Sequence, residues 1–119
     1  MARKRKSFYA SINLTNRCNL HCGHCWYHRE AHPSTPELDA GEFVEKLAAL
    51  KERHNITSVT WVGGEPLLRL DILEKATPMF SHNIISTNGT FELPSLPAIF
   101  GVSVDGPEEI NDEIRGKGV

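Results

Sequence analysis

Apolar positions along the chain alternate between two spacings, and this pattern predicts alternating strands and helices. Short strand-forming runs occupy residues 8–14, 56–62, 82–87 and 99–104, and each is followed by polar or glycine-containing turns. Between the first two runs, Phe43, Leu47 and Leu50 recur at helical spacing, and Asp39 with Glu42 resembles a capping box. We therefore expect a helix from Asp39 to about residues 51–54, a short helix over 70–76, and a last helix that begins at Pro107.

This order of elements predicts an α/β fold in which a parallel sheet is built from right-handed βα units. The connection between the third and fourth strands is short and contains Pro94 and Pro97. Because proline interrupts helices, we expect an extended crossover there rather than a helix.

Composition narrows the class of protein. The chain has 119 residues, of which 39% are hydrophobic and 24% charged, as in an ordinary globular domain. We expect a basic tail at residues 1–7 and one core domain over residues 8–119. The net charge of −2 disfavours a nucleic-acid or membrane-surface role, and the basic run at residues 3–6 is more typical of a solvated terminus. Neither a membrane span nor a secretory signal is indicated, so the cytoplasm is the expected location.

Three cysteines, Cys18, Cys22 and Cys25, follow the first predicted strand on a polar loop. An odd number of clustered cysteines is unlike a disulfide framework, whereas thiolates are the ligands that soft metals and iron–sulfur clusters prefer. The same spacing also suits a zinc site in which the three cysteines are joined by His21, His24 or His28 as the fourth ligand. Spacing by itself leaves both kinds of site open.

The surrounding sequence TNRCNLHCGHCWYH resembles the cluster loop of the radical S-adenosylmethionine (radical SAM) superfamily. The resemblance implies that Cys18, Cys22 and Cys25 bind three irons of a 4Fe–4S cluster, and that the fourth iron takes the amino and carboxylate groups of S-adenosylmethionine. Trp26 and Tyr27 fill a region where the family usually has an aromatic residue. On this interpretation the histidines are loop residues rather than ligands.

A second motif, Gly63-Gly64-Glu65-Pro66, ends the second predicted strand. Taken alone, it is typical of a strand-ending turn. In the superfamily a motif of this kind binds the methionyl amino group through its backbone, which implies that all four residues belong to the cofactor site. Glycine suits this role because main-chain carbonyls can approach a charged ammonium closely where no side chain intervenes.

Two further motifs end the third and fourth predicted strands. Residues 86–89 (STNG) are similar to a TNG motif of many members, and residues 103–107 with 111–118 are similar to the S-x-D-G…R-G-x-G stretch of members that modify peptides or help assemble cofactors. The resemblance implies that Ser103 contacts the ribose or carboxylate of S-adenosylmethionine and that Arg115 contacts the carboxylate, with Asp105 in the same motif. The alternative is that these are turn residues and a solvated helix face.

The resemblance also implies an architecture and a reaction. The architecture is an incomplete partial TIM barrel with about four strands, and the reaction is reductive cleavage of S-adenosylmethionine to a 5′-deoxyadenosyl radical, with electrons from a reductant such as ferredoxin or flavodoxin. Members contain more βα units than this sequence, so we expect a fragment, a truncated gene product or half of a split enzyme, completed by a second chain or by self-association. A non-catalytic iron–sulfur module and a small zinc-binding module are the alternatives. Nothing in the sequence indicates the substrate.

Overall fold

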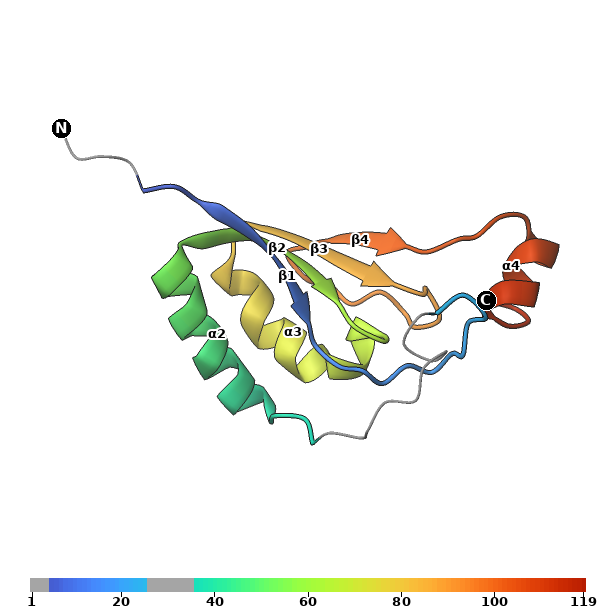
Figure 1. The fold of residues 1–119 in the computed structure, drawn as a ribbon, viewed down its shortest axis with the longest axis horizontal. Coiled ribbons are helices and arrows are strands. Elements are labelled where there is room, and N and C mark those ends of the chain that lie inside the picture. The colour runs from blue at the N-terminus through green and yellow to red at the C-terminus, as the bar shows by residue number, and fades with distance from the viewer. Residues whose placement is uncertain (1–4, 26–35) are drawn as a thin grey trace.

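The computed structural model describes residues 5–25 and 36–119, and its centre is a four-stranded sheet. All strands are parallel and follow chain order, β1 to β4 (Figure 1). Their bounds are β1 (Phe8–Asn13), β2 (Ile56–Val62), β3 (His82–Thr87) and β4 (Ile99–Val102). The predicted parallel α/β sheet is confirmed. Strands β1 and β4 end before their predicted limits, although Leu14 and Ser103 each still donate one backbone hydrogen bond to the neighbouring strand.

Two helices pack on one face of this sheet. Helix α2 (Ala40–His54) begins as predicted, since the Asp39 side chain accepts a hydrogen bond from the Glu42 backbone, and it ends at Asn55 in a left-handed conformation. Helix α3 (Leu70–Ala76) lies between two 3-10 turns, η1 (Pro66–Arg69) and η2 (Thr77–Met79). Helix α4 (Glu108–Arg115) follows β4. The sequence did not predict η1 and η2, because one-turn helices have no apolar periodicity to reveal them.

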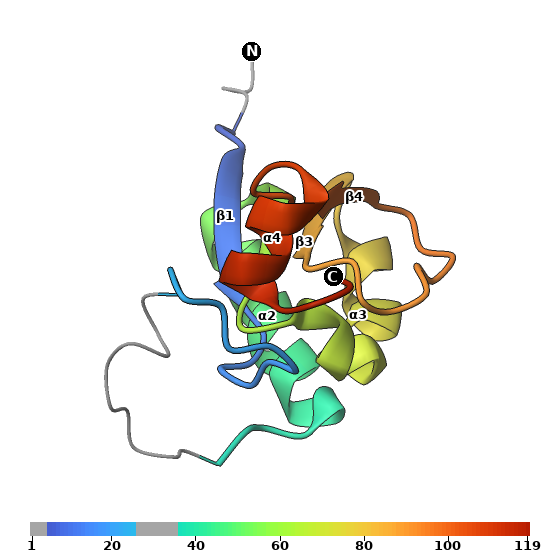
Figure 2. The same ribbon diagram turned by 90° about the vertical axis from the view of Figure 1, so that its right-hand side faces the viewer.

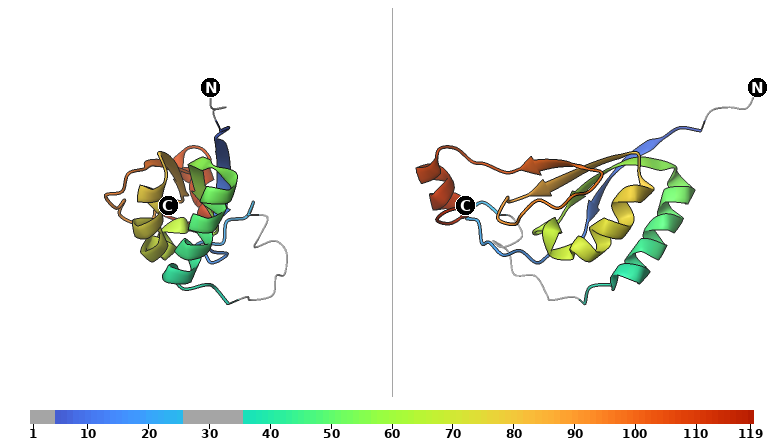
Figure 3. Two further views of the ribbon diagram at one scale, coloured as in Figure 1. Left: turned by 90° about the vertical axis from the view of Figure 1, so that its left-hand side faces the viewer. Right: turned by 180° about the vertical axis from the view of Figure 1, so that it is seen from behind.

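The hydrophobic core lies between the sheet and helices α2 and α3, which form two layers in the front and rear views (Figures 1 and 3). Trp61 and Ile85 are fully buried there, and the Trp61 ring meets Phe80 edge-on at 5.8 Å between centroids. The Trp61 indole N–H donates to Asn83 Oδ1 at 3.0 Å. Sequential strands with both of these helices on one face match a segment of a barrel wall, because a doubly wound sheet reverses its strand order and carries helices on both faces.

The crossover between β3 and β4 contains no helix or strand at residues 88–98, which confirms the extended connection. The buried Asn83 amide holds it by donating to the Pro97 carbonyl at 3.1 Å. Because the strands are parallel, their carboxyl ends lie at one edge of the sheet. The loops that carry the sequence motifs therefore gather there, and α4 lies just beyond (Figure 2). No helix within the described residues is long and apolar enough to cross a membrane.

Candidate functional site

The cysteine loop leaves β1 alongside the glycine motif that follows β2. Three backbone hydrogen bonds continue the strand pairing into these loops: Leu14 N–H to the Val62 carbonyl, Gly64 N–H to the Thr15 carbonyl at 2.7 Å, and Glu65 N–H to the Arg17 carbonyl at 2.9 Å. Cys18 follows directly after this paired segment. The path of the backbone therefore places the first cysteine beside the glycine motif.

The two glycines allow this close approach. A Cβ atom at Gly63 would lie 2.5 Å from the Thr15 carbonyl oxygen, and one at Gly64 would lie 2.5 Å from the Arg17 carbonyl carbon. Gly63 also has a φ of 153°, a backbone angle that residues with a side chain rarely adopt. The structure thus supplies a reason for both glycines that the sequence did not reveal: the cysteine loop packs directly on their backbone.

A cavity of about 500 Å³ opens at this edge of the sheet. All three cysteines line it, together with four of the seven predicted cofactor residues: Gly63, Gly64, Ser103 and Arg115. The structure therefore brings together residues from all four strand-ending segments. The lining also includes His24, which the sequence offered only as the fourth ligand of a zinc site. Seven further lining residues were not selected as site residues: Asn13, Asn16, Leu20, Val62, Ser86, Thr87 and Asn88. Residues 86–88 belong to the STNG motif, so the sequence contained a signal that could have identified them as site residues.

The sulfur of Cys18 receives two N–H groups. The Leu20 backbone N–H donates at 3.4 Å, and the Asn88 side-chain amide, at the end of β3, donates at 3.7 Å. The same amide donates to Asn19 Oδ1 at 2.8 Å, which holds it beside the cysteine. Such donors stabilise negative charge on a thiolate and influence the reduction potential of an iron–sulfur cluster.

Glu65 and Pro66 are predicted cofactor residues whose side chains are buried away from the cavity lining. The Glu65 carboxylate accepts hydrogen bonds from the Thr87 hydroxyl at 2.6 Å and from the Asn88 backbone at 2.8 Å. It also accepts the Leu67 N–H at 3.3 Å. Glu65 therefore joins the glycine motif to the end of β3, and a contact between the cofactor and the backbone of these two residues stays a prediction.

Helix α4 is attached to the cysteine loop. Gly23 N–H donates to the Ile114 carbonyl at 2.8 Å, and Asp105 Oδ2 accepts hydrogen bonds from Arg115 Nε and from His24 Nε2, the latter at 3.0 Å. The Arg115 hydrogen bond, assisted by His24, lowers the pKa of the Asp105 carboxyl. Asp105 does not line the cavity itself. Its position indicates that it orients Arg115, and the Arg115 side chain is the one that lines the cavity.

The three thiols are free and partly exposed. Burial raises the pKa of the Cys22 thiol, the positive charge of Arg115 opposes this rise, and the neighbouring Cys18 and Cys25 add to it. Because metals bind the thiolate rather than the thiol, the charge of Arg115 favours metal binding at Cys22.

The donor set fits an iron–sulfur cluster. Over residues 5–25 and 36–119, no three His, Cys, Asp or Glu side chains converge closely enough to share a single metal ion. A 4Fe–4S cluster places each thiolate on a different iron, so its ligands need to surround a cavity rather than one point. Cys18, Cys22 and Cys25 all line the cavity described above. Trp26, Tyr27 and His28 lie outside the described residues, and their roles stay predictions.

In a comparison with protein families, the model of the radical SAM superfamily matches residues 12–118. Among curated proteins, a GTP 3′,8-cyclase of Chlorobaculum tepidum is 36% identical over 103 residues, which cover 82% of this chain and 31% of that protein. A pre-heme d1 synthase of Dinoroseobacter shibae is 36% identical over 116 residues, which cover 87% of this chain and 28% of that protein. The chain thus spans less than a third of the length of these two relatives.

Solved structures show the same architecture. The structure of native anSMEcpe with bound AdoMet is 26% identical and superposes with a TM-score of 0.65, covering 92% of this chain and 35% of that one. Streptococcus suis SuiB bound to the precursor peptide SuiA is 22% identical with a TM-score of 0.66, and the match covers 92% of this chain and 27% of SuiB. The second likeness concerns the fold alone. In both, the sheet and helices of this chain match part of a larger protein.

Proposed function

This chain belongs to the radical SAM superfamily, and on that premise we propose that it binds a 4Fe–4S cluster and S-adenosylmethionine for reductive cleavage to a 5′-deoxyadenosyl radical. The observation that carries the proposal is the composition of the cavity wall. Three thiols after β1, two glycines after β2, a serine after β4 and a partly buried arginine at the end of α4 line one space of about 500 Å³. Cys18, Cys22 and Cys25 would hold three irons.

The protein's own residues bind and orient in this scheme. Gly63 and Gly64 line the cavity, and their backbone carbonyl oxygens would serve as acceptors for a methionyl ammonium. Arg115, whose side chain is 13% exposed, offers a guanidinium for a carboxylate, and Asp105 keeps it in place. The Ser103 hydroxyl is available to a ribose or carboxylate oxygen. When bound, the cluster would supply the electron that cleaves the carbon–sulfur bond of S-adenosylmethionine.

The electron has to come from outside the site. We propose a small one-electron carrier such as ferredoxin or flavodoxin as donor, and the cytoplasm as location, because clustered free thiols suit a reducing compartment. We also propose that a second chain, or a second copy of this chain, completes the barrel around the substrate.

The test begins with anaerobic reconstitution of the full 119-residue chain with iron and sulfide. We expect about four irons and four sulfides per chain, in line with the proposed cluster, and loss of the cluster in each of C18S, C22S and C25S. Dithionite and S-adenosylmethionine are then added, and 5′-deoxyadenosine and methionine are measured by chromatography. Both products should form in the wild type and be absent in the three variants.

Each outcome separates the competing functions. A full cluster without 5′-deoxyadenosine would refute catalysis by this chain alone and leave a non-catalytic iron–sulfur module. Retention of zinc with no iron uptake would refute the cluster and indicate a zinc module.

A further inference from the structure

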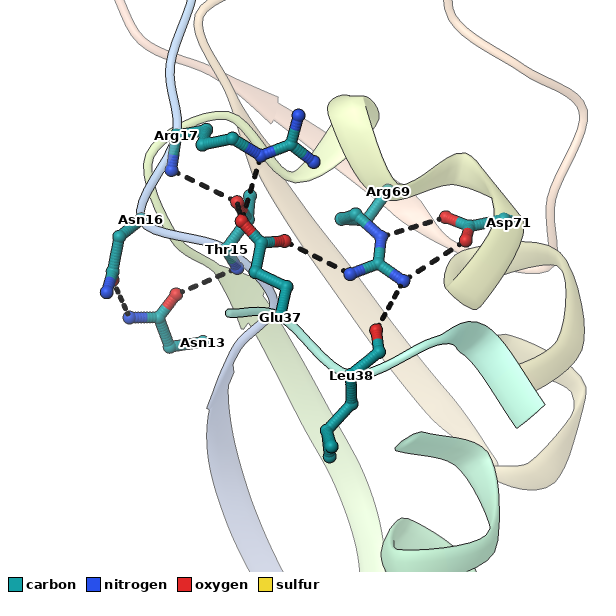
Figure 4. Close-up of polar contacts among 8 residues, drawn as sticks. All are labelled: Asn13, Thr15, Asn16, Arg17, Glu37, Leu38, Arg69 and Asp71. Carbon is teal, nitrogen blue, oxygen red and sulfur yellow. Dashed lines mark hydrogen bonds and ion pairs between the residues drawn. The ribbon is translucent and has the colours of Figure 1, made fainter. Parts of the chain in front are cut away.

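A single carboxylate ties together the two ends of the cysteine loop. Glu37, just before α2, accepts hydrogen bonds on Oε2 from the Thr15 hydroxyl at 2.7 Å and from Arg17 Nε at 2.8 Å (Figure 4). Its other oxygen, Oε1, accepts from Arg69 Nη1 at 3.0 Å. Thr15 and Arg17 precede Cys18, whereas Glu37 follows Cys25. The cysteine segment is therefore closed at its base by side chains rather than by a sheet.

Arg69 connects this base to the rigid part of the fold. Its side chain is only 8% exposed and lies at the end of η1, directly before α3. It donates through Nε and Nη2 to both Asp71 oxygens, each at 3.1 Å, and through Nη2 to the Leu38 carbonyl at 2.9 Å. A guanidinium with four such bonds has little freedom, so it defines where Glu37 sits relative to the core.

The charges of this group balance. Burial disfavours ionisation of Glu37, but hydrogen bonds from Arg17, Thr15 and Arg69 outweigh it and lower the pKa of the carboxyl. The hydrogen bond from Arg69 likewise lowers the pKa of Asp71. Two guanidinium groups thus face two carboxylates, so the buried Arg69 guanidinium and the partly buried Glu37 carboxylate each have a counter-charge.

We propose that Thr15, Arg17, Glu37, Arg69 and Asp71 form a stem clamp that positions Cys18 for the cluster, with Glu37 as the central positioning residue. The clamp acts on the backbone immediately before Cys18, which Gly64 and Glu65 hold from the other side. It keeps the loop ends together before the metal arrives, so that less conformational freedom is lost on binding. The inference rests on the proposed function, since the cluster is the ligand that the clamp serves.

The test compares E37Q with E45Q in the reconstituted full chain. Glutamine keeps the volume of Glu37 but replaces one acceptor oxygen by an NH₂ group that faces donors. Glu45 is exposed on α2, so E45Q removes the same charge from the same region and serves as matched control. The readouts are the rate of iron release to a chelator, well below each variant's unfolding midpoint, and the electron paramagnetic resonance spectrum of the reduced cluster.

We expect E37Q to release iron about 10-fold faster than the wild type and to show an altered spectrum. This magnitude is typical when a residue that supports a metal ligand is replaced. E45Q should match the wild type in both. If E37Q folds poorly, R17Q provides a second variant, because the Arg17 side chain is 62% exposed and contributes only one arm of the clamp. It should give a smaller acceleration in the same direction.

The outcomes distinguish the two proposals. If the wild type takes up no cluster, the proposed function fails, and hydrogen exchange of the metal-free chain then tests the clamp directly: residues 15–18 should exchange faster in E37Q than in E45Q. If the wild type holds the cluster but E37Q and R17Q release iron at the control rate with an unchanged spectrum, the stem clamp is refuted. A lowered unfolding midpoint with unchanged release and spectrum also refutes the clamp, because Glu37 would then support only the fold.

Discussion

The contact between Gly64 and the cysteine loop makes G64A a demanding test of the site. The added Cβ would lie 2.5 Å from the Arg17 carbonyl carbon and 3.1 Å from the Asn16 carbonyl oxygen. The Arg17 carbonyl oxygen would lie nearer still, and ordinary van der Waals contact for a Cβ begins at 3.4 Å, so the loop has to retreat by more than about 1 Å. The obstructing atoms belong to the backbone and cannot turn aside as a flexible side chain would.

The cost follows from what this movement breaks. Two backbone hydrogen bonds, Gly64 to Thr15 at 2.7 Å and Glu65 to Arg17 at 2.9 Å, would be stretched or lost, at about 1 kcal/mol each. Steric strain of an overpacked site adds about 1–3 kcal/mol. We therefore expect G64A to lose about 3–5 kcal/mol of unfolding free energy, or about 12–20 °C in Tm for a domain of this size. Cys18 follows the displaced segment, so cluster retention should fall as well.

Urea denaturation of the metal-free chain and iron content after reconstitution measure the two effects. G101A is the control, because its Cβ would meet nothing nearer than the Ile85 carbonyl at 3.9 Å. G101A should stay within about 1 kcal/mol of the wild type. A G64A chain that is as stable as G101A and also carries a full complement of iron would refute the predicted clash.

Three other predictions concern single side chains. N83A should cost about 3 kcal/mol in urea denaturation, because this buried amide bonds to Trp61, Thr77, Phe80 and Pro97; a loss below about 1 kcal/mol would contradict it. N88A removes an N–H donor from the Cys18 sulfur, so the cluster should become harder to reduce, and a redox titration that shows no negative shift would count against that bond. Because the pKa of Glu37 is lowered in the folded chain, its stabilisation is present above its ordinary value of 4.5 and is lost as the pH falls through the folded value. The urea midpoint of the wild type should therefore drop more steeply on acidification than that of E37Q, and parallel curves would contradict this.

Local sequence predicted much of the framework and part of the site. Residues 56–62, 70–76 and 82–87 form their predicted elements with the predicted bounds, because their apolar spacing and flanking turns agree with the final packing. The three cysteines, the two glycines, Ser103 and Arg115 line one cavity, and their roles as metal ligands and cofactor contacts stay predictions. Glu65 was chosen by its motif, yet its side chain is buried and bonded to Thr87 and Asn88.

Other features had no signal in the sequence. Glu37 and Arg69 are 32 positions apart, and His24 and Asp105 are 81 apart. Neither pair belongs to a periodic pattern, and charged residues of this kind are usually solvated. Their pairing follows from the order of the strands, which brings distant loops to one edge of the sheet.

The amino-acid sequence by itself determined the parallel βα pattern and the thiol chemistry of Cys18, Cys22 and Cys25, because both depend on residue type and short spacings. Only the tertiary structure decided which side chains support those thiols. It placed the Asn88 amide at the Cys18 sulfur and Arg115 beside Cys22, and it joined Glu37, at one end of the loop, to Thr15 at the other. The physical reason is that hydrogen bonds and charge pairs act over a few ångströms in space, and chain separation carries no information about which polar groups come that close.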